Sequence, residues 1–362
     1  MITLKKAVEY LLIIILILSY FQYAFEEYRR IVAARCYEQV VELVNADMIE
    51  ESMDNMKKAI KYNSHNAYYW SVLGLIYDRM DSIEISSENP IIYKKYSRNN
   101  GNNEAKIAFE KASKLNKRDD VFMHNLAWLE FYDGNIIRAI DYITKAKEND
   151  SSSAINYLSA GLFYESTKSI DKVLENISHS IILEPSIIDS KVLKNFEKRN
   201  YDIYNNAIKI ATLFLEKEML YENDPIIAAK LGKLYIKQGK NNSALNNLCY
   251  ALKILPNINR AWVNMSHIYF NYGNFNMAQK YLTRARMLNS NDLVYLREVC
   301  LQSLTKEYDN MICKSMNDNV KMMQSLHSQK VSRIYHIENV IVDDIIPRGL
   351  LKSMAPIEIS NN

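Results

Sequence analysis

In the middle of the chain, apolar and small residues recur every three or four positions, which is the spacing of one face of an α-helix. The stretch 228–235 places such residues at Ala228, Leu231, Gly232 and Tyr235. After a Gly-Lys-Asn-Asn turn, a second stretch does the same at Ala244, Leu248 and Ala251. The pattern predicts two short amphipathic helices whose apolar stripes face each other, and small residues let their backbones approach closely.

The same pattern returns 34 residues later. The paired positions are Leu231 and Met265, Gly232 and Ser266, Tyr235 and Tyr269, Gly239 and Gly273, Ala244 and Ala278, Leu248 and Leu282, and Ala251 and Ala285. A fixed period of this length indicates helical hairpins that stack on one another, because one hairpin cannot bury its apolar face alone.

These residues resemble the tetratricopeptide repeat, whose pattern is W-x2-L-G-x2-Y, then A-x3-F, then P. Earlier copies begin at Trp70, Leu73, Gly74 and Tyr77, at Leu126 and Ala127, and at Tyr157, Gly161 and Tyr164. The resemblance implies an all-α, right-handed superhelix of antiparallel helix pairs over residues 31–292. Two departures are expected within it: an inserted loop at about 82–103, either functional or disordered, and a degenerate repeat or hinge at about 188–224.

An apolar segment, Ala7–Phe25, precedes the repeats, and we assign residues 1–30 to it and its flanks. Its length of about 28 Å as a helix matches the hydrocarbon thickness of a bilayer. The centre, Leu11–Leu18, has no polar side chain. A cleaved signal peptide and a core helix are the alternatives. Because no small-x-small cleavage site follows, we predict one transmembrane helix that anchors the chain in the lipid bilayer through residues 7–25.

The side of the membrane is less constrained, since Lys5 and Lys6 precede the segment and Arg29, Arg30 and Arg35 follow it. Long domains translocate largely regardless of charge, so we expect the repeats on the extracytoplasmic (periplasmic) side, with the cytoplasmic side as the alternative. The period fails past Leu293. Residues 293–330 are expected to form capping helices, and residues 331–362 an irregular, extended tail that lies along the solenoid or a partner, or a disordered end.

Motifs for catalysis are missing from the sequence: it has no HExxH, GxSxG or Walker loop. The six histidines are scattered, and the four cysteines form no CxxC pair, which gives no indication of a metal site. A net charge of +3 is too small to indicate nucleic-acid binding. We therefore expect no enzyme activity, no cofactor, no nucleic acid and no small-molecule substrate.

The resemblance also implies that first helices line a concave groove that binds polypeptides, through residues turned away from the packing face. Here these residues are Lys230, Lys233, Lys237, Arg260, Asn264, His267 and Asn271. We call them the basic strip and predict that it binds acidic segments or a C-terminal carboxylate. The alternative is a solvated, lysine-rich face. Further back, Trp128 and Tyr132, with Phe131, either line the groove or pack between repeats.

Two classes of function follow. The first, which we favour, is a membrane-anchored scaffold that mediates protein–protein interaction as a structural or accessory subunit of a membrane-associated complex, because 26 tyrosines and an apolar tail suit permanent interfaces. The second is a reversible adaptor or assembly factor that captures acidic segments in its groove.

Overall fold

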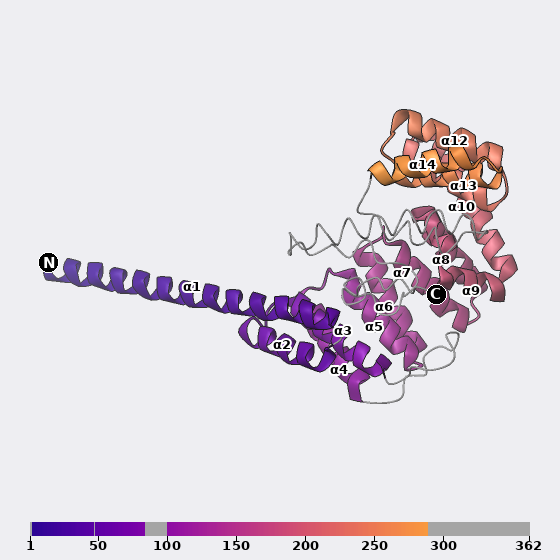
Figure 1. Cartoon of the computed structure of the whole chain (residues 1–362). Helices are drawn as coiled ribbons and strands as arrows, with labels where there is room; N and C mark the ends of the chain where they lie inside the picture. Colours follow the sequence, from indigo (N-terminus) through magenta and orange to yellow (C-terminus); the bar gives the residue numbers. More distant parts are fainter. Residues whose placement is uncertain (1, 47, 84–99, 289–362) are drawn as a thin grey trace. The chain divides into compact units, whose positions relative to one another are not determined.

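The computed structural model describes residues 2–46, 48–83 and 100–288 of the chain. Within these ranges the chain forms fourteen α-helices and one 3-10 helix, and it contains no strand. The helices form two compact units, with the division between Asn135 and Ile136. We call these parts unit 1 and unit 2 (Figure 1). The all-α class predicted from the repeats is confirmed.

Unit 1 holds five helices, each packed against the next one along the chain. They are α1 (Ile2–Asn45), α2 (Ile49–Tyr62), α3 (Ala67–Ile83), α4 (Asn100–Leu115) and α5 (Asp120–Tyr132). The tightest contact joins α3 to α4, where a Cβ atom on Gly74 would lie 2.9 Å from the ring of Phe109. The small residue predicted to bring two helices together therefore does so.

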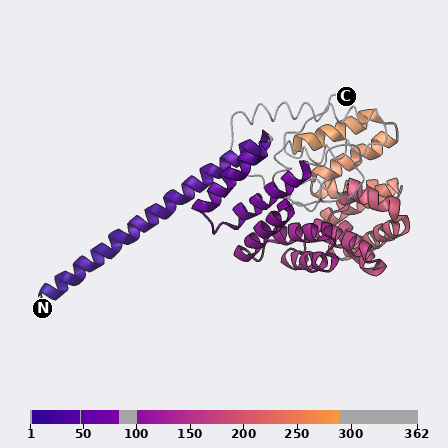
Figure 2. The ribbon, with the colours of Figure 1, turned by 90° about the horizontal axis from the view of Figure 1, so that it is seen from below.

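Helix α1 is a single helix of 44 residues, although the sequence predicted an anchor at 7–25 and a separate superhelix that begins at residue 31. Its first half projects away from α2 and α3 (Figures 1 and 2). Its second half packs into unit 1 through Ala33, Tyr37, Val40 and Val44, all buried. The two predicted elements merge because neither glycine nor proline interrupts the chain between them.

Unit 2 continues the hairpins. Its elements are α6 (Ile136–Asn149), α7 (Ala154–Ser166), α8 (Ile170–Leu183), η1 (Pro185–Asp189), α9 (Lys191–Arg199), α10 (Tyr201–Glu222), α11 (Pro225–Lys237), α12 (Asn241–Ile254), α13 (Asn259–Asn271) and α14 (Phe275–Leu288). The most extensive helix contacts in this unit join α7 to α8, α11 to α12, and α13 to α14. These three pairs are the hairpins that the periodicity predicted.

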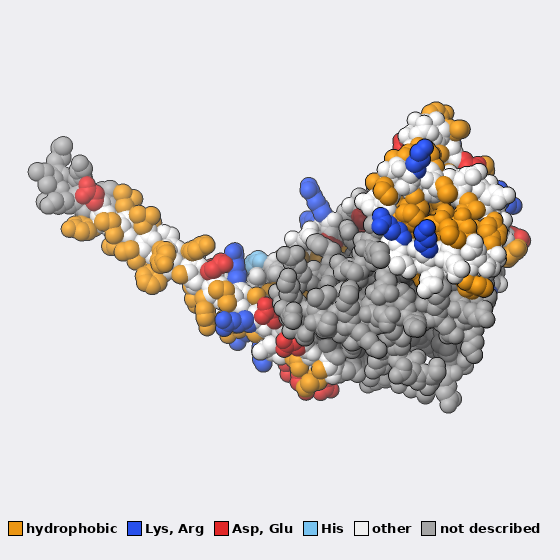
Figure 3. Space-filling model, turned by 45° about the horizontal axis from the view of Figure 1, so that its top comes forward, with side chains coloured by type: hydrophobic (Ala, Val, Ile, Leu, Met, Phe, Trp, Pro, Cys, Tyr) orange, Lys and Arg blue, Asp and Glu red, His pale blue; other side chains and the backbone are white. Residues whose placement is uncertain are grey.

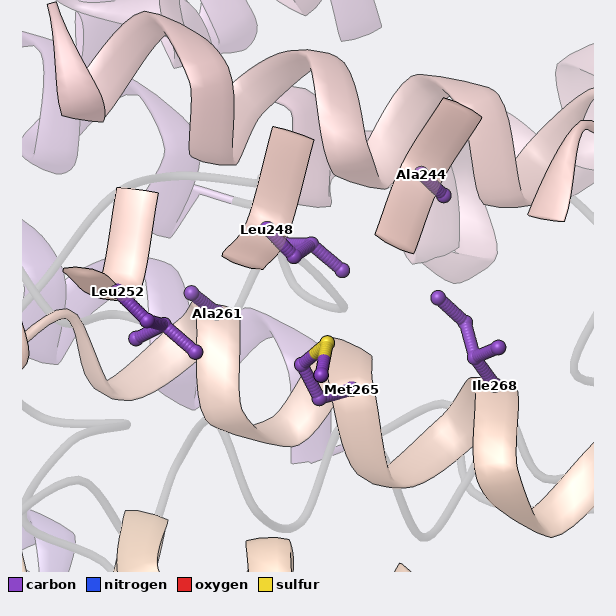
Figure 4. Close-up of a cluster of buried hydrophobic side chains, with 6 residues drawn as sticks. All are labelled: Ala244, Leu248, Leu252, Ala261, Met265 and Ile268. Atoms are coloured by element: carbon purple, nitrogen blue, oxygen red, sulfur yellow. The ribbon is translucent and has the colours of Figure 1, made fainter. Parts of the chain in front are cut away.

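Neighbouring hairpins share an apolar core. Between α12 and α13 this core consists of Ala244, Leu248, Leu252, Ala261, Met265 and Ile268 (Figure 4). None of these side chains is more than 9% exposed, and Tyr235, Trp262 and Tyr269 pack against them. Burial of apolar surface stabilises a fold by about 25 cal/mol per Å². This contact is therefore the main force that stacks one hairpin on the next.

The turn inside the α11–α12 hairpin contains a left-handed glycine. Gly239 follows α11 with φ +73°, in the left-handed region that favours glycine. Its amide donates to the carbonyl oxygen of Ile236 at 3.0 Å, and the Lys240 amide donates to that of Tyr235 at 2.8 Å. The carbonyl groups at the end of α11 are thereby satisfied, and the chain reverses into α12.

The segment predicted to be a degenerate repeat, 188–224, contains the end of η1, then α9 and α10. A hydroxyl cap starts α9, since Ser190 Oγ accepts from the Leu193 amide at 3.1 Å. Helix α10 is 22 residues long, and it packs against both α8 and α11. It ends at Asn223, which has φ +48°, just before Pro225 opens α11.

Three predicted parts of the chain lie mostly or wholly outside the described residues. Helix α3 ends at Ile83 and α4 begins at Asn100, so the predicted loop at 82–103 falls largely between them. The capping helices at 293–330 and the extended tail at 331–362 also lie outside the described residues.

The close approach in the α11–α12 hairpin gives a direct test. A Cβ atom at Gly232 would lie 2.6 Å from Leu248 Cγ, so Gly232→Ala overpacks the contact and we expect a loss of about 1–3 kcal/mol in the free energy of unfolding. In a Leu248→Ala background the added methyl group meets a smaller neighbour, and the same substitution should be less destabilising. Thermal and urea unfolding followed by circular dichroism measures both. An equal loss in the two backgrounds would contradict the proposed contact.

Candidate functional site

The basic strip predicted from the sequence lies on α11 and α13 of unit 2. Lys230, Lys233 and Lys237 are three and four residues apart on α11, so they share one side of that helix. The side they occupy is turned toward η1 and the helix that follows it, because each lysine reaches an atom in the segment 182–197. The strip therefore faces part of its own chain.

Each cation of the strip already has an oxygen partner. Lys233 forms an ion pair with Asp189, and the two side chains are only 11% and 18% exposed. Lys237 Nζ lies 3.2 Å from Glu197 Oε1. The remaining two partners are Glu184, which pairs with Arg260, and the carbonyl oxygen of Ile182, which accepts from Lys230 Nζ at 3.2 Å.

The cations of the basic strip and the oxygen atoms that they pair with form one layer, which we call the charged layer. The charges of this layer shift one another's pKa values. Burial acts to raise the pKa of Glu184, but Arg260 and hydrogen bonds from Ser186 outweigh it and hold the pKa below its usual range. Burial lowers the pKa of Lys230, and nearby carboxylates only partly oppose this. Both shifts follow from charged groups gathered in a partly dry environment.

Two further residues of the strip are enclosed. Burial and the charge of Lys233 lower the pKa of His267 to about 4, so its imidazole is neutral at physiological pH. Asn264 is only 5% exposed, whereas Asn271, the last residue of α13, is exposed. Of the three amide and imidazole side chains predicted to line a groove, only Asn271 is exposed.

A buried tyrosine lies at the base of the layer. The Nζ atom of Lys237 lies 5.1 Å from the centre of the Tyr204 ring, and Tyr204 is fully buried on α10. Burial, together with the charges of Glu197 and Asp189, raises the pKa of its phenol well above the usual value. The layer thus joins η1, α9, α10, α11 and α13.

Sequence reasoning missed the acidic half of this layer. Glu184, Asp189 and Glu197 lie around and within the degenerate segment, where the repeat pattern assigns no role to any position. Their ion pairs join residues 40 to 76 positions apart, as the residue numbers of the pairs give. No sequence signal marks these acids, because lysines and an arginine of the same segment are interspersed with them.

The aromatic residues predicted to line the groove further back lie on α5 in unit 1. Trp128 is 4% exposed, and its ring centre lies 5.6 Å from that of Phe131 and 5.5 Å from that of Tyr132. The Trp128 ring is therefore packed rather than presented to solvent. Tyr132 is half-buried at the end of the same helix.

A shallow hollow of about 720 Å³ lies beside α13 and α14. Trp262 and Tyr281 form its aromatic part, with ring centres 5.7 Å apart and nearly stacked. Lys280 and Arg284 supply basic groups. The repeat pattern did not single out Lys280, Tyr281 or Arg284, which lie on the second helix of the last described hairpin.

The described residues include no group of three or more histidine, cysteine or acidic side chains that could hold a metal ion. The chemistry available in the strip is ionic and already satisfied. An acidic ligand must displace Asp189, Glu197 or Glu184 from its cation before it can bind there. The assignment of the basic strip as a ligand site stays a prediction, and these internal pairs oppose it.

The stacked helical hairpins define an all-α repeat protein. The family model of the tetratricopeptide repeat matches residues 260–292, which span α13 and α14, so the chain is a repeat protein that carries a tetratricopeptide repeat. A search of curated proteins finds no match.

Several solved structures are similar to this chain. MamA is 15% identical, covers 63% of this chain and 91% of its own, and has a TM-score of 0.34. A tetratricopeptide repeat protein from Parabacteroides merdae is 16% identical, with coverages of 78% and 99% and a TM-score of 0.38. Yeast Tom70 is 14% identical, with coverages of 84% and 56% and a TM-score of 0.40. At these scores, the assignment rests on the family model and on the packing described above.

The Lys233–Asp189 pair can be tested by exchanging its charges. Lys233→Glu places a second carboxylate beside Asp189 in a largely buried position, and we expect a loss of about 3 kcal/mol in the free energy of unfolding. Adding Asp189→Lys should restore part of it. Lys253→Glu, at an exposed position on α12, is the control and should change little. If all three variants unfold at the same midpoint, the Lys233–Asp189 pair does not contribute to stability as predicted.

His267 predicts an acid-dependent loss of stability. Its folded pKa of about 4 lies below the ordinary value near 6.5, so the unfolded chain binds the proton first as the pH falls. The stability given by the neutral imidazole is full above about pH 6.5 and is lost as the pH falls through about 4.

Between pH 7 and pH 4.5 this loss is on the order of 2 kcal/mol. Since His267→Gln cannot take up the proton, its stability should fall less than that of the wild type over the same interval. Urea titrations of both proteins at the two pH values measure the difference. Parallel curves would show that His267 does not titrate as inferred.

Proposed function

We propose that this protein is a membrane-anchored scaffold that holds other proteins, as a structural or accessory subunit of a membrane-associated complex. The observation that carries the proposal is the joining of stacked helical hairpins to one long apolar helix that remains exposed along its first half. Hairpin arrays offer extended surfaces to polypeptides. An apolar helix that is not covered by protein can bury its surface in the hydrocarbon of a bilayer.

The anchor is supported by the length and composition of α1. Residues Glu9–Val44 have a mean hydropathy of 1.4 in their most apolar window, and none of that window is buried in unit 1. A core helix of a soluble protein passes the same composition test but is mostly buried. A signal sequence passes it too, and the bulky residues Tyr20–Phe25 argue against cleavage there.

A scaffold role is also supported by the way the polar groups of unit 2 are used. The cations of the basic strip, and the acids opposite them, hold parts of the chain together. We propose that the protein acts by binding other chains and has no catalytic activity of its own. The adaptor role remains the second candidate, favoured by the basic and aromatic hollow at α13 and α14.

A charge in the apolar segment tests the anchor. Ile15→Arg places a cation near the centre of the segment, where insertion costs about 2.5–3.5 kcal/mol, and we expect the chain to shift from the membrane to the soluble fraction after carbonate extraction. Ile137→Arg is the matched control, because Ile137 is 86% exposed on α6 and should leave the partition unchanged. If both variants stay in the membrane pellet as the wild type does, α1 is not the anchor.

Two measurements test the finer parts of the proposal. After extraction in mild detergent, a permanent subunit migrates on a native gel with its partners, whereas a reversible adaptor migrates alone.

For the side of the membrane, we propose that the repeats are extracytoplasmic. Cys249 is an exposed thiol on α12, so in a variant whose other cysteines are serine, an impermeant maleimide should label intact cells. Labelling only after lysis would place unit 2 in the cytoplasm.

A further inference from the structure

We infer that the end of unit 1 nearest the apolar half of α1 contacts anionic phospholipid headgroups. This inference rests on the proposed anchor and concerns a surface that the anchor alone does not assign. The surface, which we call the basic end face, consists of Arg29, Arg30, Lys61, Lys114, Lys117 and Arg118. All six belong to unit 1, on α1, on α2, in the last turn of α4 and on the α4–α5 connection.

Helix α2 returns along α1 toward the apolar segment. Arg29 Nη2 donates to the carbonyl oxygen of Lys61 at 3.3 Å, which fixes the last turn of α2 at the level of Arg29. Arg29 comes four residues after Phe25, the last residue of the apolar segment, or about 6 Å along the helix axis. The turn that follows α2, residues 63–66, therefore lies about one helical turn from the hydrocarbon boundary.

Helix α4 ends at the same level. The indole nitrogen of Trp70, in the first turn of α3, donates to the carbonyl oxygen of Ser64 at 2.9 Å. The Nζ atom of Lys111, in the last part of α4, lies 5.5 Å from the centre of the Trp70 ring. These contacts connect the end of α2, the start of α3 and the end of α4. Lys114, Lys117 and Arg118 follow Lys111 directly in the chain.

Three of the six cations of the basic end face are uncompensated, whereas Lys117 has an interaction of its own. Lys61, Lys114 and Arg118 are exposed and have no carboxylate partner among the residues that the structure describes. On α1, Arg29 and Arg30 pair with Glu26 and Glu27 at 3.4 and 3.3 Å in exposed positions, where such pairs are weak. The other acids at this end are Glu110, one turn before Lys114 on α4, and Asp119 and Asp120 at the start of α5, where Asp119 caps the helix.

The opposite end of α2 has the opposite charge, since the helix begins with Glu50 and Glu51. Lysines near helix C-termini also complement the helix dipole, which accounts for Lys61 and Lys114. It does not account for Arg118, which lies beyond the end of α4. Figure 3 shows hydrophobic side chains along most of the projecting part of α1 and charged side chains where it meets the rest of unit 1.

Because α1 is one helix from the apolar segment into unit 1, no flexible linker separates this face from the bilayer. Each lysine or arginine held near an anionic leaflet is attracted to it, within a Debye length of about 8 Å at physiological salt. The face carries arginine and lysine within this range, and it adds exposed Tyr62 and His65, whose side chains suit the headgroup layer.

Quenching by labelled headgroups tests the inference on the full chain in nanodiscs. A fluorophore is attached at Ser64→Cys, next to the basic end face, or at Glu51→Cys, about 15 Å farther along α2, with the native cysteines replaced by serine. The nanodiscs contain phosphatidylcholine alone or mixed with phosphatidylglycerol, each with a nitroxide-headgroup lipid. We expect stronger quenching at position 64 than at 51, and a further increase at 64 when phosphatidylglycerol is present.

The triple variant Lys61→Glu, Lys114→Glu, Arg118→Glu should lose that increase. The triple variant Lys198→Glu, Lys209→Glu, Lys253→Glu changes the net charge equally at exposed positions of unit 2 and should keep it. Equal quenching at position 64 in both lipids, with the chain still bound to the nanodisc, would overturn the inference and leave the anchor intact. A chain that does not bind nanodiscs at all would instead refute the anchor.

Discussion

The close approach of two helix backbones inside each hairpin is the constraint on which the rest of this structure depends. Gly232 and Gly161 stand where a methyl group would overlap a leucine or isoleucine of the facing helix, at 2.6 Å in both cases. That approach brings the apolar stripes of both helices to one side, where neither can be covered within the hairpin. Each hairpin must therefore stack on another, and the apolar core between α12 and α13 is the result.

Where the repeat loses its pattern, the joint changes from apolar to ionic. The segment of η1 and α9 meets α11 and α13 through Asp189, Glu197 and Glu184, each paired with a cation. Ion pairs of this kind add little net stability compared with well-packed apolar groups, but they specify which surfaces meet. Most cations of the basic strip, which the sequence predicted to bind a ligand, pair in the fold with acids of the segment 184–197.

The hairpins were predictable from the sequence because their contacts are local. Gly232 and Leu248 meet as a consequence of helical spacing and one short turn, and the same spacing recurs at Ser266 and Leu282. The ion pairs were not predictable in this way. Lys233 meets Asp189 only because the chain between them folds into an irregular pair of helices, α9 and α10, whose geometry no periodic position encodes.

The continuity of α1 has the widest consequence for function. A scaffold attached to a membrane by a loose linker samples many orientations, whereas a helix without a break transmits the tilt of its apolar half to the domain that it enters. Here the entry is rigid, because Ala33 and Tyr37 are buried among the helices of unit 1 less than four turns after the apolar segment ends. Under the proposed anchor, the turn after α2 stays near the membrane surface, while the acidic start of α2 points away from it. A partner that binds unit 1 would then meet it in a restricted range of orientations to the bilayer.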